Sequence, residues 1–128
     1  MSILRIMPFS IALLLTGVAY AEPMLTDDQI FTISGSMYKA YQSGGVNNMY
    51  NQELKCWKDA SKTKRADKVK VETCMTMAIS GAFVEASYAR QQMRGSVPQY
   101  TVNEVNKRIE KSSRMTENEL EALRETLI

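Results

Sequence analysis

The sequence predicts an all-α protein: a small irregular bundle of four to five helices with one disulfide, preceded by a cleaved signal peptide. Three observations lead to this prediction. Apolar residues recur at helical spacing, no alternating β-branched run indicates a strand, and the 128-residue chain has only two cysteines. A chain of this length has room for one domain, which we expect over residues 22–128.

The first 21 residues are typical of an export signal. Arg5 supplies a positive charge, an apolar stretch follows over 6–18, and residues 19–21 (Ala-Tyr-Ala) have the small-x-small pattern that signal peptidases recognise. The stretch is interrupted by Pro8 and is shorter than the ~20 residues of a spanning helix. We therefore expect cleavage after Ala21 and export, to the periplasm of a bacterium.

Two helices are expected in the first half of the remaining chain. Thr26 and Gln29 form a capping box, apolar residues follow at helical spacing, and the pair Gly44-Gly45 ends this helix. A second helix is expected over about 47–60, with its apolar residues on one side.

The central helix is expected over about 66–94, ended by Gly95 and Pro98. Gly81 lies among small residues and is expected to be a notch in which a neighbouring helix packs. Phe83 is expected to widen the buried face. The apolar stripe that predicts this helix consists of Val71, Met75, Ala78, Ala82, Ala86, Ala89 and Met93.

Two shorter helices are expected to complete the chain. Thr101 with Glu104 and Thr116 with Glu119 have capping-box spacing, and apolar residues follow each pair at helical intervals. Residues 112–114 are expected to separate the two helices.

The two cysteines, Cys56 and Cys74, are expected to form a structural disulfide in an oxidising compartment. Their spacing does not match the Cys-x-x-Cys pattern of a redox pair. Trp57 is expected to pack beside the disulfide in the core rather than serve as an exposed recognition residue.

Composition excludes several kinds of chemistry. The chain has no histidine, so Ser-His-Asp and Cys-His catalysis and histidine-ligated zinc are excluded. Glu85 borders the apolar stripe and is the first residue to test as catalytic, but a rim position or a pair with a nearby arginine is the simpler interpretation. We expect a chemically silent apolar interior, no catalytic residue, no metal and no cofactor.

Basic residues are concentrated between positions 55 and 70, where seven lysines and arginines stand against two aspartates. This segment is interpreted either as a solvated connection between helices or as a surface for an anionic partner, meaning an acidic protein or membrane phosphates. Nucleic acid is not expected, because aromatic residues are not interleaved with the basic ones. The candidate binding residues are Lys58, Lys62, Lys64, Arg65 and Lys68.

The expected function is binding of another macromolecule, most simply a protein of the cell envelope, as an inhibitor, immunity or accessory protein. A periplasmic chaperone, a membrane-surface protein and an enzyme with a site around Glu85 are the alternatives. In its layout of signal, helical body and one disulfide, the chain resembles the periplasmic immunity proteins that neutralise type VI secretion amidases. It is similar in the same way to acid-stress periplasmic chaperones. Because layout alone carries both resemblances, no residue role is transferred.

Overall fold

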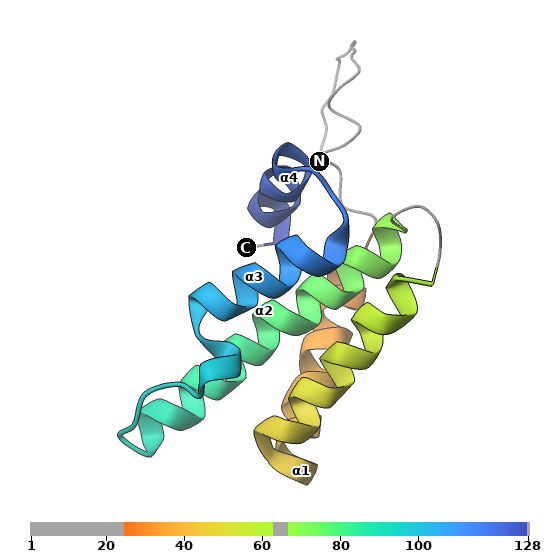
Figure 1. Cartoon of the computed structure of the whole chain (residues 1–128). Helices are drawn as coiled ribbons and strands as arrows, with labels where there is room; N and C mark the ends of the chain where they lie inside the picture. Colours follow the sequence, from red (N-terminus) through yellow and green to blue (C-terminus); the bar gives the residue numbers. More distant parts are fainter. Residues whose placement is uncertain (1–24, 63–66, 128) are drawn as a thin grey trace, which may run out of the picture. The chain divides into compact units, whose positions relative to one another are not determined.

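The computed structural model describes residues 25–62 and 67–127. The helices of these residues are, in chain order, α1 (Asp27–Ala60), α2 (Lys68–Gln91), the 3-10 helix η2 (Pro98–Tyr100), α3 (Val102–Ser113) and α4 (Glu117–Leu127) (Figure 1). No strand occurs among the described residues, which confirms the all-α class. The expected signal peptide, residues 1–21, lies outside the described range.

The chain divides into two compact units. The larger unit, Met24–Met115, contains α1, α2, η2 and α3, and every site discussed below lies in it. The smaller unit contains α4, which begins with the expected capping box: the Glu119 amide donates to Thr116 Oγ1, and the Thr116 amide donates to Glu119 Oε1. Since the two units are described separately, one domain over 22–128 stays a prediction.

Helix α1 begins at the expected cap and is divided where two helices were expected to meet. The capping box of Thr26 and Gln29 is confirmed. Gly45 has non-helical backbone angles of φ 75° and ψ −167°, a region that only glycine adopts readily. Next to it, the Asn48 side-chain amide donates to the Ala40 carbonyl at 2.8 Å and so satisfies the end of the first half. Residues 44 and 45 therefore do separate two helical segments.

The two halves of α1 run in opposite directions past α2. The end of the first half meets the end of α2, since the rings of Tyr41 and Tyr88 lie 4.2 Å apart. The end of the second half meets the start of α2, since Cys56 is bonded to Cys74. In Figure 1 the helix accordingly descends in orange and rises again in yellow and green. The first half is thus parallel to α2 and the second half antiparallel.

Helix α2 lies at the centre of the larger unit and contacts α1, η2 and α3. It starts after Asp67, whose side chain accepts from the Lys70 amide, and most of the expected stripe is buried. The notch at Gly81 is confirmed, but it receives an aromatic ring rather than a helix. A Cβ atom at position 81 would lie 2.8 Å from the ring of Tyr100.

Two residues expected in the core of this helix are exposed. Phe83 faces solvent, and Met93 lies beyond the end of α2 with 89% of its surface exposed. The periodic pattern continued past the point where the helix ends, and so it assigned Met93 to the wrong environment. Gly81 and Glu85 are buried in this part of the helix, while Ala82 and Ala86 are only half-buried.

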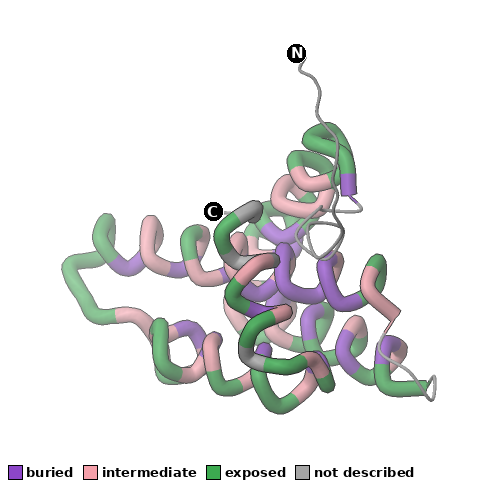
Figure 2. Tube along the Cα trace, turned by 90° about the horizontal axis from the view of Figure 1, so that it is seen from above, coloured by how far each residue is buried: buried purple, intermediate pink, exposed green. Residues whose placement is uncertain are grey.

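The interior of the larger unit is not the silent apolar core that the sequence suggested. Glu53, Glu72 and Glu85 are completely buried, as are the core methionines Met37 and Met49. Figure 2 shows how buried and exposed segments alternate along the helices. None of the described helices combines the length and the apolar character that a membrane crossing needs.

Candidate functional site

The candidate binding residues fall on two helix ends that the disulfide joins. Lys58 and Lys62 lie at the end of α1 and Lys68 begins α2, whereas Lys64 and Arg65 lie outside the described residues. The Cys56–Cys74 disulfide is confirmed, with Cα atoms 5.6 Å apart. The bond fixes the end of α1 against α2 and thereby the direction in which its lysines point.

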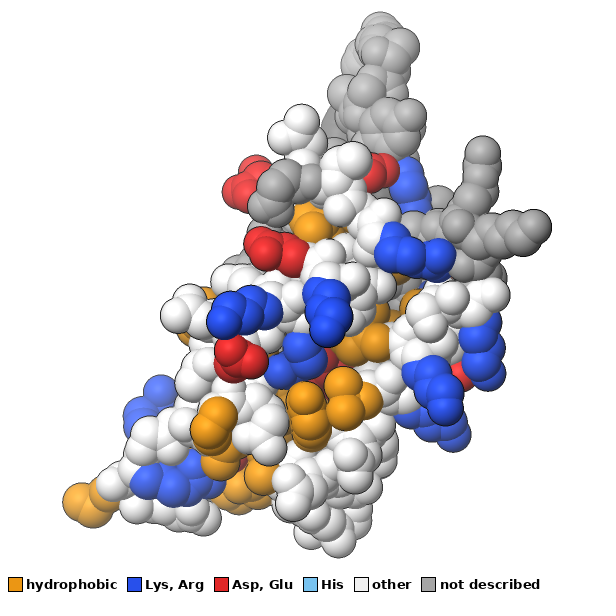
Figure 3. Space-filling view, viewed as in Figure 1, with side chains coloured by type: hydrophobic (Ala, Val, Ile, Leu, Met, Phe, Trp, Pro, Cys, Tyr) orange, Lys and Arg blue, Asp and Glu red, His pale blue; other side chains and the backbone are white. Residues whose placement is uncertain are grey.

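The second half of α1 has one basic face, which we call the basic surface and define as Lys55, Lys58 and Lys62. Lys55 and Lys58 lie one turn apart on the same side of α1, and Lys62 follows in the turn after the helix ends at Ala60. Lys62 pairs with Asp59 at 3.3 Å, and because both side chains are exposed, water screens this pair strongly. Leu54 is exposed next to the lysines. In Figure 3, blue side chains gather over this half of α1.

The opposite face of this half-helix points into the core and carries a buried carboxylate. Glu53 is completely buried, and the indole nitrogen of the buried Trp57 donates to its Oε2 atom at 3.0 Å. Arg108 of α3 donates from Nε to Oε2 at 2.8 Å and from Nη2 to Oε1 at 3.0 Å. Both carboxylate oxygens are therefore satisfied by charge-assisted or neutral donors.

Arg108 is enclosed by aromatic rings. Its guanidinium carbon lies 4.9 Å from the centre of the Tyr50 ring and 5.2 Å from that of Tyr100. A third donor, Nη1, reaches the carbonyl of Gln99. We call Glu53, Arg108 and the three aromatic residues Tyr50, Trp57 and Tyr100 the Glu53 cluster. It joins α1, η2 and α3, and the sequence interpretation did not identify it.

Tyr100 carries the buried polar atom of the Glu53 cluster that has no hydrogen-bond partner. Its hydroxyl is buried and has no hydrogen-bond partner in the structure. Burial raises the pKa of Tyr100 well above its ordinary value, and the nearby negative charge of Glu53 raises this pKa further. Tyr100 therefore stays neutral, and its ring packs against Gly81.

Glu85 was the first residue to test for catalysis, and a pair with a nearby arginine was the simpler interpretation. The structure shows that pair, with Arg94. Arg94 Nη1 lies 2.6 Å from Glu85 Oε2, and the Val97 amide donates to the same oxygen at 3.0 Å. Burial opposes ionisation of Glu85, but the hydrogen bonds from Arg94 and Val97 outweigh it and lower its pKa below the ordinary value. Glu85 is fully buried rather than at a rim, and it holds the connection that follows α2.

The third buried carboxylate, Glu72, holds the start of the described chain. The amide of Leu25 donates to Glu72 Oε1 at 2.9 Å, and Leu25 is itself buried. Each of the three glutamates thus accepts from a segment outside its own helix. A sequence signal existed for Glu53, because it occupies an apolar stripe with Met49, Trp57 and Ala60 at helical spacing.

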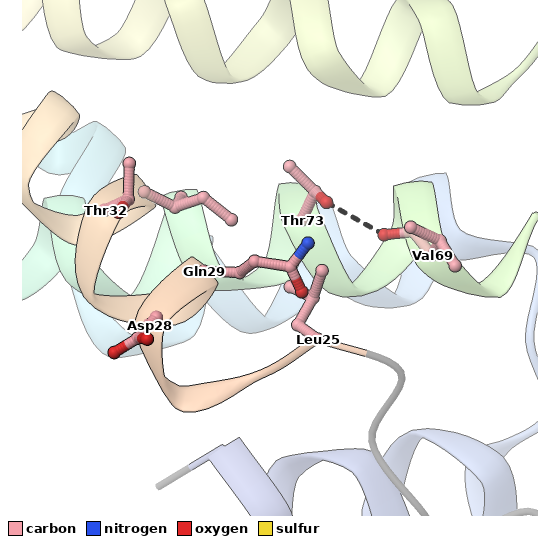
Figure 4. A pocket seen from close by; sticks show the side chains of 7 residues that line it. Leu25, Asp28, Gln29, Thr32, Val69 and Thr73 are labelled. Atoms are coloured by element: carbon pink, nitrogen blue, oxygen red, sulfur yellow. Dashed lines mark hydrogen bonds between the residues drawn. The ribbon is translucent and has the colours of Figure 1, made fainter.

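An open groove of about 390 Å³ lies between the starts of α1 and α2. Figure 4 shows the side chain of Gln29 extending across it toward α2, and the Thr73 hydroxyl donating to the Val69 carbonyl at 2.9 Å. The side chains are mixed in character and contain a single carboxylate, which gives no acid–base pair. The labelled lining residues are Leu25, Asp28, Gln29, Thr32, Val69 and Thr73.

The described side chains also include no group of three or more cysteines or acids that could hold a metal ion. The fold and these sites define a class: a small all-α protein braced by one disulfide and by buried glutamates. Comparison of the chain with known protein families, curated proteins and solved structures finds no match.

Proposed function

We propose that this chain is a small exported helical protein that acts in the bacterial periplasm by binding a protein partner of the cell envelope. The finer role is that of an inhibitor, immunity or accessory protein. The observation that carries the proposal is the division of the second half of α1 into a buried face and the basic surface, with the disulfide at its end. A rigid basic face is suited to an acidic protein surface, because little ordering is needed on binding.

Two features favour this proposal over the alternatives. Leu54 is exposed beside the lysines, and a protein interface combines apolar contact with charged residues around it. An enzyme centred on Glu85 is less favoured, because both oxygens of that carboxylate accept hydrogen bonds from Arg94. A chaperone or a membrane-surface protein would also use an exposed basic and apolar face, so the test separates them from a specific partner.

The test compares two charge reversals of equal size. A photo-cross-linking amino acid at position 54 identifies the partner in cells that export the protein, and the purified partner is titrated with each variant. We expect Lys58→Glu with Lys62→Glu to weaken binding about tenfold, with a smaller salt dependence than the unmodified protein. Lys107→Glu with Lys111→Glu on α3 is the control and should change the dissociation constant less than about twofold.

Three results would contradict the proposal. The first is equal binding of the partner by the two double variants. The second is capture of no protein from position 54. The third is capture of many unrelated unfolded proteins with similar yield. The last result would favour the chaperone alternative. Loss of binding to phosphatidylglycerol vesicles in Lys58→Glu with Lys62→Glu, without a protein partner, would favour the membrane alternative.

A further inference from the structure

A second surface with the composition of a protein interface lies at the other end of α2. We call it the distal surface and define it as Tyr38, Tyr41, Tyr88, Arg90, Met93 and Arg94. The disulfide attaches to the first turns of α2, whereas Met93 and Arg94 follow its last residue. A helix of 24 residues is about 36 Å long, so the distal surface is separate from the basic surface.

The aromatic part of the distal surface is ordered by stacking. Tyr88 of α2 stacks on Tyr41 at 4.2 Å and lies 6.4 Å from Tyr38, with interplanar angles of 12° and 23°. Tyr38 is exposed, and Tyr41 accepts a hydrogen bond on its hydroxyl from Arg94 at 3.4 Å. The three rings are thus held in place before any partner binds.

Met93 is placed at a backbone position that glycine normally occupies. The Arg94 amide donates to the Ala89 carbonyl at 2.9 Å and the Met93 amide to the Arg90 carbonyl at 3.2 Å. These two bonds form a Schellman motif in which Met93 is the left-handed residue, with φ 56°. A methionine is less stable than glycine in this conformation, and its side chain is 89% exposed.

The connection that presents Met93 is fixed by its neighbour. Arg94 bonds to the Gln92 side chain at 2.8 Å, to Glu85 at 2.6 Å and to the Gly95 carbonyl at 3.0 Å. The hydrogen bonds of Arg94 fix this connection, and they therefore hold the exposed Met93 in its strained left-handed conformation. Such a residue contributes little to folding, which directs attention to a contact with another molecule.

Charge at this end of the unit has one sign. Residues 86–103 contain Arg90 and Arg94 and no aspartate or glutamate. Arg94 is paired with the buried Glu85, so Arg90 supplies the exposed positive charge. Tyrosine, methionine and arginine are enriched in protein interfaces, whereas acids are depleted there. Binding to a lipid surface does not require a rigid connection. It also needs a broader apolar face than one methionine supplies.

We propose that the distal surface is a second protein-binding surface, in which Met93 enters an apolar pocket of the partner and the exposed Arg90, whose carbonyl accepts from the Met93 amide, meets a carboxylate at the rim of that pocket. The anchor is rigid, so binding orders few additional side chains. The proposal goes beyond the basic surface and does not depend on it, because no lysine of α1 takes part.

The test uses the whole exported protein with a photo-cross-linking amino acid at position 93, and at Phe83, which is also exposed, as control. The protein captured from position 93 is identified, purified and titrated with Met93→Gly, Met93→Leu and Val102→Ala. We expect Met93→Gly to raise Tm by about 4 °C, because glycine suits the left-handed position, and to weaken binding about tenfold. Met93→Leu should stay within about threefold of the original affinity, and Val102→Ala should be unchanged.

The opposing effects of Met93→Gly on stability and affinity distinguish a binding residue from a structural one. A lower Tm would show that Met93 packs on its own chain, and unchanged affinity would show that it is not an anchor; either result overturns the proposal. Equal capture from positions 83 and 93 also overturns it, as does binding to phosphatidylglycerol vesicles with no protein captured. Lys58 and Lys62 are unchanged throughout, so failure here leaves the test of the basic surface intact.

Discussion

Glu53 and Glu85 are both completely buried and both held by an arginine that comes later in the chain, but the two arginines lie in different surroundings. Arg108, the partner of Glu53, has 12% of its side chain exposed and lies between two tyrosine rings. Arg94, the partner of Glu85, has 34% of its side chain exposed and belongs to the connection that carries Met93. The two ion pairs are of the same kind but lie in different surroundings, one enclosed by aromatic rings and one on a partly exposed connection.

The difference indicates what each pair stabilises. In the Glu53 cluster the pair joins three helical elements, so its loss should affect the whole larger unit. The Glu85 pair holds one connection against the end of α2, so its loss should affect that connection most. Water can also reach Arg94 and replace part of the lost interaction. Stability measurements can separate these two roles.

The largest effect is expected for Arg108→Met. This substitution leaves Glu53 buried with Trp57 as its remaining donor, and removing one partner of a buried ion pair costs about 4 kcal/mol. Urea denaturation followed by circular dichroism measures the change in the free energy of unfolding. Adding Glu53→Gln to Arg108→Met should recover part of the loss, because the neutral amide is less costly to bury. A loss below about 1 kcal/mol would mean that water reaches Glu53.

A smaller effect is expected for Arg94→Met, about 2 kcal/mol, because Arg94 is partly exposed and solvent screens the remaining carboxylate. Hydrogen exchange should then show faster exchange over residues 92–100 than over α1. If the loss equals that of Arg108→Met and exchange rises everywhere, the two pairs do not differ as proposed.

The pKa of Glu85 gives this second region a pH dependence. Its folded-state pKa lies below the ordinary value of 4.5, so the unfolded state binds the proton first as the pH falls. The stabilisation by Glu85 is therefore complete above about pH 5 and is lost as the pH falls through the lowered pKa. The stability difference between the unmodified protein and Glu85→Gln should shrink on acidification below pH 4.5. A difference that does not change with pH would contradict this assignment.

The smallest effect is expected for Tyr100→Phe in the Glu53 cluster. The substitution removes a buried hydroxyl that has no hydrogen-bond partner, while the ring that packs on Gly81 remains. We expect the free energy of unfolding to stay the same or to rise by about 0.5 kcal/mol. A clear loss of stability in urea denaturation would show that the hydroxyl has a partner, such as an ordered water.

The parts of the fold that depend on neighbouring residues were predictable from the sequence. The capping boxes at Thr26 and Thr116 and the break at Gly45 involve groups only a few residues apart, and all three are confirmed. The disulfide was predictable because two cysteines allow only one intramolecular pair, Cys56 with Cys74.

The sites could not be predicted because their partners are distant in sequence. Glu53 and Arg108 are 55 positions apart, and a lone glutamate in an apolar stripe does not reveal which arginine will meet it. Met93 was misplaced for a different reason: α2 ends in a Schellman motif without the glycine that normally signals it. Hydrophobic periodicity alone therefore extended the helix too far.

The change of direction at Gly45 also determines whether both halves of α1 can pack on one α2 helix. A residue that favours helix at position 45 would allow the 34 residues of α1 to form a continuous rod of about 51 Å. The two ends of such a rod could no longer pack on the same α2. Glycine at this position thus allows both halves of α1 to cover one α2.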